Sequence, residues 1–430
     1  MLHQNSVFHS VLKQVPWHRF DRLVDEHHAD KHIRSLTTKS QLIALIYAQL
    51  SGAQSLREIE AALTSHATKL YHLGGEEVAR ATLADANAQR PWQLFSGLFA
   101  HLTGQVTRGL RRKAGEAVHL IDSTGLRLSA LSQDWAQYSA GVCGAKMHAI
   151  YDPDADAPIY AAVTAANVND ITAAKAMPIT AGATYVFDLG YYDYGWWAKL
   201  DAAGCRIVTR LKVNTKLSVA AESAVANGSN ILSDRIGHLP QRMARNRGNP
   251  FRKPVREVRV CIESGKVLRI LTNDLNAPAA EIADLYKRRW QIELFFRWIK
   301  QTLKIRHFIG RSENAVRIQI AVALIAFLLL RLAHAAQRTV PSLLGFARLV
   351  RANLMHRRPL DRLLDPPPSI QQNHRQLSFN LYAVHVTTRK SLGSMMRKLS
   401  VTESQRSAQF RGTVPRRNPS VASANWAQVA

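Results

Sequence analysis

The residues best suited to chemistry are concentrated in Leu285–Lys300, where one acid stands among two cations and an aromatic side chain. If this segment is one helix, Tyr286, Arg289, Glu293 and Lys300 lie at roughly 0°, 300°, 340° and 320° around its axis. All four side chains then point within an arc of about 60°. A helix face that meets only water would seldom place its single carboxylate among groups suited to phosphate or base contact.

The same segment carries an apolar stripe that predicts packing against a core. Its members recur at helical spacing and are centred near about 250°: Leu285, Ile292, Phe296, Ile299 and Leu303. The charged face therefore lies at the rim of a buried surface, where the protein can fix side-chain positions.

Composition limits the class of protein. The chain has 430 residues, 47% of them hydrophobic, and 57 Lys and Arg against 31 Asp and Glu give a net charge of +26. It can bury large cores, is too long for a single one, and is not a disordered chain. So large a positive charge favours a polyanionic partner, which is nucleic acid first, with an anionic membrane surface as the alternative.

The sequence favours a cytoplasmic protein without a membrane partner. The N-terminus lacks the basic region and apolar run of a signal peptide. The most apolar stretch, Ile318–Leu330, is about 13 residues long, whereas a membrane span needs roughly 20. Cys143, Cys205 and Cys261 are isolated, so neither a zinc site nor a disulfide framework is expected.

Periodicity predicts helices at both ends of the chain and strands between them. Ser55 with Glu58 begins a capped helix and Thr82–Arg90 opens another, a pattern compatible with a helix-turn-helix or with plain helical packing. From about Ala117 we expect three strands, a helix, a strand, a helix and a strand, which is an α/β order. The expected segments are helical residues 1–112, α/β residues 113–212, a β-rich insertion 213–276, the charged helix in 277–308, and helical residues 309–430 with a basic tail.

Two acids follow buried strands of this α/β unit. Ala117–Asp122 and Thr184–Asp188 each read as a strand ending on a carboxylate. If these strands are parallel neighbours, Asp122 and Asp188 converge at one edge of the sheet, and Glu293 could supply a third acid. Three oxygen donors suit Mg²⁺ or Mn²⁺, and two ions about 4 Å apart would clamp both oxygens of an in-line phosphoryl transfer. Alone, each Asp would more often be a turn former or helix cap.

These residues resemble a known family. Tyr286-x₂-Arg289-x₃-Glu293-x₆-Lys300 is similar to the signature of the DDE transposases of bacterial insertion-sequence family 4. Asp122-Ser-Thr and Asp188-x-Gly-Tyr resemble the blocks that carry that family's first two acids. The resemblance implies an RNase H-like mixed-sheet core interrupted by the β-rich insertion. It also implies an N-terminal DNA-binding region, to which Arg80–Asn87 and the preceding helices are similar.

The resemblance implies cut-and-paste transposition on double-stranded DNA, acting on the terminal inverted repeats of an element and on target DNA. Asp122, Asp188 and Glu293 would be catalytic and would hold the metals. Water would nick the element end, the freed 3′-hydroxyl would form a hairpin with the opposite strand, and after opening it would join the target. Tyr286, Arg289 and Lys300 would contact the DNA backbone, which suits Arg as a fork and Lys as a point charge.

One departure concerns the aromatic residue on which related enzymes stack a flipped base. The insertion has no tryptophan, and Phe251 is its one aromatic residue. Trp290 on the charged helix is the alternative stacking residue, because a flipped base needs a π-face. Partly buried packing explains Trp290 equally well.

Basic stretches add expected DNA contacts. The insertion is rich in cations, among them Arg245, Arg247, Arg252 and Lys253, which suit backbone contact or form a solvated basic loop. The C-terminal tail is also basic and could bind DNA without sequence preference.

The sequence thus predicts a metal-dependent transposase associated with the bacterial nucleoid. The alternatives are an RNase H-like nuclease without strand transfer, and a transposase-derived DNA-binding protein that has lost catalysis. Two element ends imply a homodimer on DNA. The apolar residues 318–332 need cover either from a second subunit or, as expected for the free protein, from the same chain.

Overall fold

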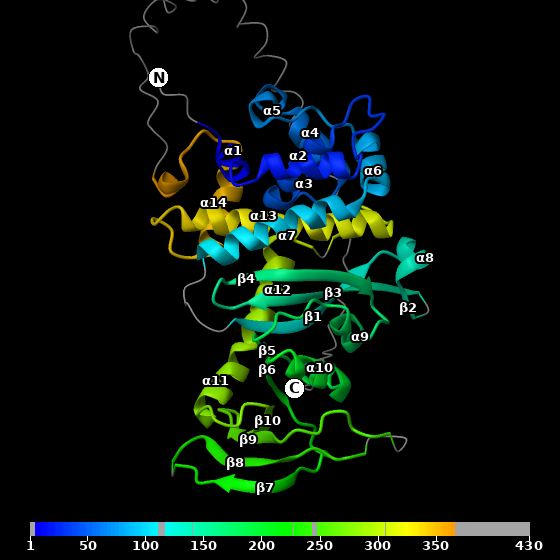
Figure 1. The fold of residues 1–430 in the computed structure, drawn as a ribbon. Coiled ribbons are helices and arrows are strands. Elements are labelled where there is room, and N and C mark those ends of the chain that lie inside the picture. Colours follow the sequence, from blue (N-terminus) through cyan, green and yellow to red (C-terminus); the bar gives the residue numbers. More distant parts are fainter. Residues whose placement is uncertain are drawn as a thin grey trace, which may run out of the picture. The chain divides into compact units, whose positions relative to one another are not determined.

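The computed structural model describes residues 5–110, 117–139, 141–226, 228–242, 247–305 and 307–365. The chain splits into two compact units, Met1–Asp365 and Pro366–Ala430, and the second lies outside the described residues. The predicted basic tail belongs to that second unit. Figure 1 shows the described part of the chain coloured along the sequence.

Helices precede the sheet, and local capping defines their ends. Ser55 accepts a hydrogen bond from the N–H of Glu58 at 3.2 Å, and Glu58 accepts one from the N–H of Gln54 at 2.8 Å. The predicted capped helix is therefore confirmed. Gly74 ends the next helix in the left-handed conformation, which glycine adopts readily. The bounds are α1 Val7–Leu12, α2 Trp17–Glu26, α3 Thr38–Ser51, α4 Leu56–Thr64, α5 Ala67–Leu73, α6 Arg80–Gln89 and α7 Trp92–Leu110.

One mixed sheet follows these helices. Its strands are β1 Val118–Leu128, β2 Gln137–Ser139, β3 Val142–Asp152, β4 Ala157–Ala165, β5 Thr184–Val186, β6 Arg206–Arg210, β7 Ser218–Ser223, β8 Ile231–His238, β9 Val255–Cys261 and β10 Val267–Thr272. Their order is β2-β3-β1-β5-β6-β10-β9-β8-β7, with β4 also pairing with β3. Strands β4, β3 and β1 are antiparallel neighbours, whereas β1, β5 and β6 are parallel.

This strand order confirms the predicted fold class, an RNase H-like mixed sheet with a helical N-terminal region. Strands β3 and β4 form an antiparallel pair across a short turn, and the expected strand–helix–strand repeats follow it. The strands of residues 213–276 do not stand apart from the core. Strand β10 pairs with β6, so the hydrogen-bonded sheet continues from the core into β9, β8 and β7.

The sheet has two differently covered faces because side chains alternate along each strand. Leu120, Val186 and Val208 belong to the large core that includes the N-terminal helices and the charged helix. Their neighbours Ile121 and Ile207 belong to a smaller core under α10, which spans Tyr194–Ala202. Short elements complete this part of the chain: η1 Ala130–Ser132, α8 Gln133–Ala136, α9 Asp170–Lys175 and η2 Leu189–Tyr191.

The charged segment is two helices rather than the single helix predicted. Helix α11 covers Ala279–Arg288 and α12 covers Trp290–Thr302, with Arg289 at the junction. The N–H of Arg289 donates to the carbonyl of Tyr286, and the carbonyl of Arg289 accepts from the N–H of Ile292. Both bonds join residues three apart, as in a 3₁₀ turn, instead of four apart as in an α-helix. The prediction was wrong at this point because helical periodicity cannot show a single-residue tightening.

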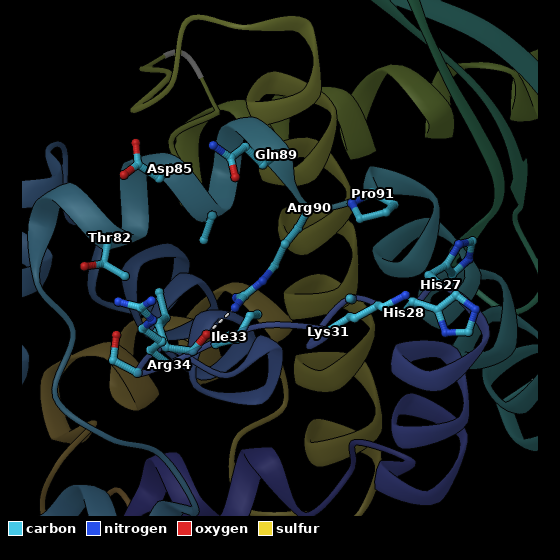
Figure 2. A pocket seen from close by; sticks show the side chains of 14 residues that line it. His27, His28, Lys31, Ile33, Arg34, Thr82, Asp85, Gln89, Arg90 and Pro91 are labelled. Carbon is cyan, nitrogen blue, oxygen red and sulfur yellow. Dashed lines mark hydrogen bonds between the residues drawn. The ribbon is translucent and has the colours of Figure 1, made fainter.

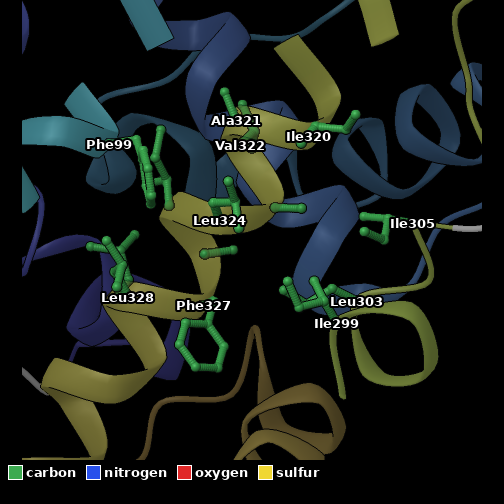
Figure 3. Packing of buried hydrophobic residues seen from close by; sticks show 14 of the residues in the cluster. Phe99, Ile299, Leu303, Ile305, Ile320, Ala321, Val322, Leu324, Phe327 and Leu328 are labelled. Atoms are coloured by element: carbon green, nitrogen blue, oxygen red, sulfur yellow. The ribbon is translucent and has the colours of Figure 1, made fainter. Parts of the chain in front are cut away.

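Helix α13, Glu313–Ala335, is covered by its own chain, as expected for the free protein. It contacts α7, α3, α6, α14 and β4, with α14 at Leu343–Asn353 and a last turn η4 at Leu360–Arg362. Figure 3 shows Leu324, Phe327 and Leu328 of α13 facing neighbouring helices that contribute Phe99 and Ile299. Of the described residues, only α13 is long and apolar enough to cross a membrane, and 89% of that stretch is buried inside the protein.

The contact between α12 and α13 yields a stability prediction. The ring of Phe327 lies 5.1 Å from Phe295 and 5.0 Å from Trp298. We expect Phe327→Ala to lower the free energy of unfolding by about 3–5 kcal/mol, because it opens a cavity between the two helices. Chemical denaturation measures this loss. Leu344→Ala is the control, since that side chain is 38% exposed, and an equal loss in both variants would contradict the packing.

Candidate active site

Asp122 and Asp188 stand at the same level of two parallel strands. Strand β1 pairs with β5 in the register Val118↔Thr184 and Leu120↔Val186, so each acid comes two residues after a matched pair. The prediction that these strands are parallel neighbours is confirmed. The prediction that both strands end on the acid is wrong for Asp122, because β1 continues to Leu128 alongside β3.

The early end of β5 creates the opening at which the acids meet. After Val186 the chain leaves the sheet, and the carboxylate of Asp188 accepts a hydrogen bond from the N–H of Gly190 at 2.8 Å. This turn begins η2. Asp122 therefore loses its neighbour on one side while still held by β3 on the other. Both acids share the strand parity of Leu120 and Val186, which face the core that includes α12.

Arg289 links Glu293 to the first acid. One of its terminal nitrogens lies 3.3 Å from a carboxylate oxygen of Asp122, and the other lies 2.5 Å from one of Glu293. The side chains of Arg289 and Asp122 are each 17% exposed, so these are partly buried ion pairs. The tightened junction between α11 and α12 thus carries a cation that reaches both the sheet and the next helical turn.

The surroundings of Asp122 raise the pKa of its carboxyl group. Burial is the largest cause that raises it, and the charges of Asp188 and Glu293 raise it further. The N–H of Ser123 and the guanidinium of Arg289 lower it, yet the pKa of Asp122 still reaches about 7. Like charges and poor solvation together outweigh one nearby cation.

These three carboxylates are oxygen donors of the kind that hard divalent cations prefer. In the described residues, however, no three acidic, imidazole or thiol side chains are placed to hold a metal ion as they stand. The expectation that the carboxylates share a common point is therefore not met in this arrangement. In this arrangement the guanidinium of Arg289 bonds to both Asp122 and Glu293.

The other signature residues differ in exposure. Tyr286 is 8% exposed, and the guanidinium of Arg289 lies 5.9 Å from its ring centroid. Lys300 is half-buried on α12. Trp290 is 50% exposed and has the guanidinium of Arg297 at 6.0 Å from its ring. The face of this indole is accessible, whereas the phenol of Tyr286 belongs mainly to the core.

Of the predicted cations of the insertion, two are exposed and one forms an ion pair. Arg247 and Arg252 are exposed, and Arg252 lines a hollow of about 510 Å³ together with Arg242. Lys253 pairs with Asp201 at 2.7 Å. Arg245 lies outside the described residues.

Other residues of the insertion serve the fold. Arg256, from the same basic run, is buried and bonds both oxygens of Asp234, so it stabilises the sheet. Phe251 is 4% exposed and is a core residue rather than an accessible stacking surface.

Two residues near the acids were missed from the sequence. Arg210 ends β6, and its charge opposes the rise that burial causes in the pKa of Tyr286. Asp170 begins α9 and accepts a hydrogen bond from Ser123, the residue after Asp122. The sequence did offer a signal for Arg210, because a cation stands at the end of β6, the strand that pairs with β5. An acid in the first turn of a helix is ordinary, so nothing local distinguished Asp170.

A second basic hollow lies on the N-terminal helices, shown in Figure 2. Its volume is about 460 Å³, and the loop between α2 and α3 meets α6 across it. The loop contributes His28, Lys31 and Arg34, and α6 contributes Asp85 and Gln89. The floor is rigid, since Arg90 donates to the carbonyl of Leu36 and to Gln41.

Comparison with known proteins assigns the chain to a family. Residues 113–329 match the Transposase DDE domain family, and residues 3–76 match a family described as Domain of unknown function (DUF4372). The y4zB protein of Sinorhizobium fredii, which carries the name of a transposase, is 42% identical over 298 residues, or 68% of this chain and 82% of that protein.

Two further likenesses are more distant. A Geobacillus stearothermophilus protein named as a transposase of element IS5377 is 27% identical over 285 residues, covering 65% of this chain and 74% of its own. The piggyBac transposase, solved in a synaptic complex with hairpin DNA, covers 84% of this chain with a TM-score of 0.39 and 10% identity, and 81% of that chain is covered.

The family match spans the sheet, both strand-borne acids and the charged helix. DDE transposases act on DNA and use divalent metal ions. The chain therefore belongs to the Transposase DDE domain family, and it is a DNA-cleaving and strand-transferring enzyme.

Proposed function

We propose that this transposase moves its element by cut-and-paste chemistry, with Asp122, Asp188 and Glu293 as the catalytic acids. The observation that carries the assignment is that Arg289 ties Glu293 to Asp122, while matched register places Asp188 beside Asp122. The raised pKa of Asp122 supports it, because burial causes most of that rise and the charges of Asp188 and Glu293 add to it. Groups whose environment disfavours their charge are frequent at functional sites.

The three acids would hold Mg²⁺, or Mn²⁺ in its place, and two ions per site suit the reaction. When bound, such ions stabilise the charge that develops on the attacking and leaving oxygens of the phosphodiester. The donor set is all carboxylate, which suits hard cations that also keep waters. The chain's own contribution would be to carry these acids on a strand, on the turn after a second strand and on a packed helix.

Arg289 would exchange partners during this process. Without metal its guanidinium is the charge that offsets Asp122 and Glu293. If Asp122 and Glu293 held a divalent cation, the guanidinium of Arg289 would be free to bind two oxygens of a DNA phosphate. Arg289 would thereby couple metal binding to DNA binding.

DNA would extend from the acids over the exposed residues of α12 and the insertion. The accessible face of Trp290 can stack an unpaired base, and Arg247 and Arg252 can contact the backbone. Contact of DNA with Tyr286, Lys300 and Lys253 would need local rearrangement, because Tyr286 is buried and Lys253 is paired with Asp201. A hairpin intermediate would place its flipped base against Trp290.

The N-terminal helices, residues 1–112, would supply the DNA-binding region for the terminal inverted repeats. The hollow between the α2–α3 loop and α6 presents Lys31 and Arg34 toward solvent, and Asp85 is the one acid lining it in the described residues. Such a cationic concavity suits a phosphate backbone. We further propose a homodimer on paired element ends, acting in the cytoplasm at the nucleoid.

The first prediction concerns pH. Asp122 must lose its proton to bind a cation, and its pKa of about 7 means that protons compete below neutrality. The concentration of Mg²⁺ that half-saturates cleavage should rise by up to about tenfold per unit as pH falls below 7, and should level off above it. Cleavage of element-end DNA measured across Mg²⁺ and pH tests this. A requirement unchanged between about pH 6 and 8 would contradict the grouping of the acids.

The second prediction separates chemistry from binding. Asp188→Asn keeps the shape of the side chain but removes its charge, so cleavage should fall by at least about 10²-fold, which matches the several kcal/mol that metal ions supply. Binding to element ends, followed by gel shift without metal, should be retained. Glu222→Gln is the control, because that acid pairs with Arg235 on exposed β7. Loss of binding together with cleavage would show a structural role instead.

The third prediction concerns salt. If Lys31 and Arg34 contact phosphates, replacing both with Gln should reduce the log–log salt slope of end binding by about 2, since each neutralised phosphate contributes about 0.9. Arg19→Gln on α2 is the matched control, because Arg19 is already paired with Glu26 at 2.8 Å. An unchanged slope in the double variant would show that Lys31 and Arg34 do not contact DNA phosphates. Fluorescence anisotropy across salt concentrations gives the slopes.

A further inference from the structure

A network of polar side chains lies behind the first acid, on the other face of the sheet. Its centre is Asp170, the first residue of α9. One oxygen of Asp170 accepts from the hydroxyl of Ser123 at 2.7 Å and lies 3.2 Å from the ammonium of Lys146. Lys146 also donates to the carbonyl of Val168 at 3.0 Å, which fixes the approach to α9.

Ser123 is the link between this network and the active site. It follows Asp122 in β1, so alternation turns its side chain to the opposite face of the sheet from that acid. Its own N–H donates to a carboxylate oxygen of Asp122 at 2.7 Å. The side chain of Ser123 is therefore held from behind by Asp170, while its backbone holds the carboxylate in front.

The network is formed by side chains of hydrogen-bonded neighbouring strands. Ser123 pairs with His148 of β3, and Gly125 pairs with Lys146, so the side chains that meet Asp170 come from adjacent strands. His148 is fully buried, bonds Thr164 at 2.9 Å and has its other ring nitrogen 3.7 Å from Asp170. Side-chain freedom here is small.

The same carboxylate also stands beside the turn that carries the second acid. A Cβ on Gly190 would lie 3.0 Å from an oxygen of Asp188 and 3.5 Å from an oxygen of Asp170. Only a residue without a side chain lets these two carboxylates approach the turn together. Asp170 thus contacts the supports of both Asp122 and Asp188 from a position that α9 fixes.

We infer that Asp170 is a positioning residue for the reaction: through Ser123 it sets the orientation of the Asp122 carboxylate that binds the catalytic cation. The inference rests on the proposed role of Asp122. Residues that orient metal-binding side chains typically change metal affinity or activity by about 10–100-fold when altered. Asp170 reaches Asp122 through Ser123, and it also stands beside the turn of Asp188.

The test compares Asp170→Ala, Ser123→Ala and their double variant in the full chain. Each single variant should raise the Mg²⁺ concentration that half-saturates end cleavage by about 10-fold or more. The double variant should be no worse than Asp170→Ala, because both changes break one link. Ser123→Thr keeps the hydroxyl and should retain most of the activity. A second readout without DNA is the rise in melting temperature that Mg²⁺ produces, which should shrink in both alanine variants.

The control for lost stability is Asp234→Asn, which breaks the buried pair with Arg256 elsewhere in the sheet. It should lower the melting temperature but leave the Mg²⁺ requirement unchanged. Two outcomes overturn the inference: Asp170→Ala with a normal Mg²⁺ requirement, or a Ser123→Ala variant that behaves as the parent while Asp170→Ala does not. If instead the parent protein cleaves without any divalent cation, the proposed function itself fails.

Discussion

The structure depends on bringing like charges together without leaving them uncompensated. Asp122 and Asp188 meet because β5 ends where β1 continues, and Glu293 faces them from α12. Carboxylates in such proximity repel, and burial makes the repulsion stronger. Arg289 offsets it with a guanidinium shared between Asp122 and Glu293. A charge between these acids is a condition of the fold as well as of the chemistry, which explains why a residue suited to phosphate lies among acids.

Holding Arg289 in that place requires the helices around it to be fixed. The neighbouring Arg288 pairs with Asp154 in the turn between β3 and β4 at 2.7 Å. The next residue but one in that turn, Asp156, pairs with Arg331 of α13 at 3.1 Å. One β-turn therefore ties α11 and α13 to the sheet on either side of α12. The aromatic contacts of Phe327 with α12 close the same arrangement through apolar packing.

The two faces of the sheet carry different polar side chains. Asp122 lies on the face under α12, whereas Ser123 bonds to Asp170 of α9 on the other face. Because β-strand side chains alternate, consecutive residues can serve the two faces at once. The strands of the insertion extend the same hydrogen-bonded sheet through β10, so the insertion and Asp122 share one framework.

The sequence by itself determined the elements and the signature. Alternation and helical spacing located the strands and the apolar stripe of α12, because they reflect which side chains must leave water. The spacing of Tyr286, Arg289, Glu293 and Lys300 also indicated the family before any geometry was known. The apolar length of residues 318–332 required cover, and burial in the same chain followed from the size of that chain.

Only the tertiary structure decided which neighbours these residues meet. The extension of β1 past Asp122 comes from its pairing with β3, and the tightened turn at Arg289 appears only in the folded chain. Likewise, Lys253 is paired because Asp201, far away in sequence, lies beside it. Asp170 gained its role in the same way. Local pattern reports which face a side chain takes, but hydrogen bonds and ion pairs form between segments that only the folded chain brings together.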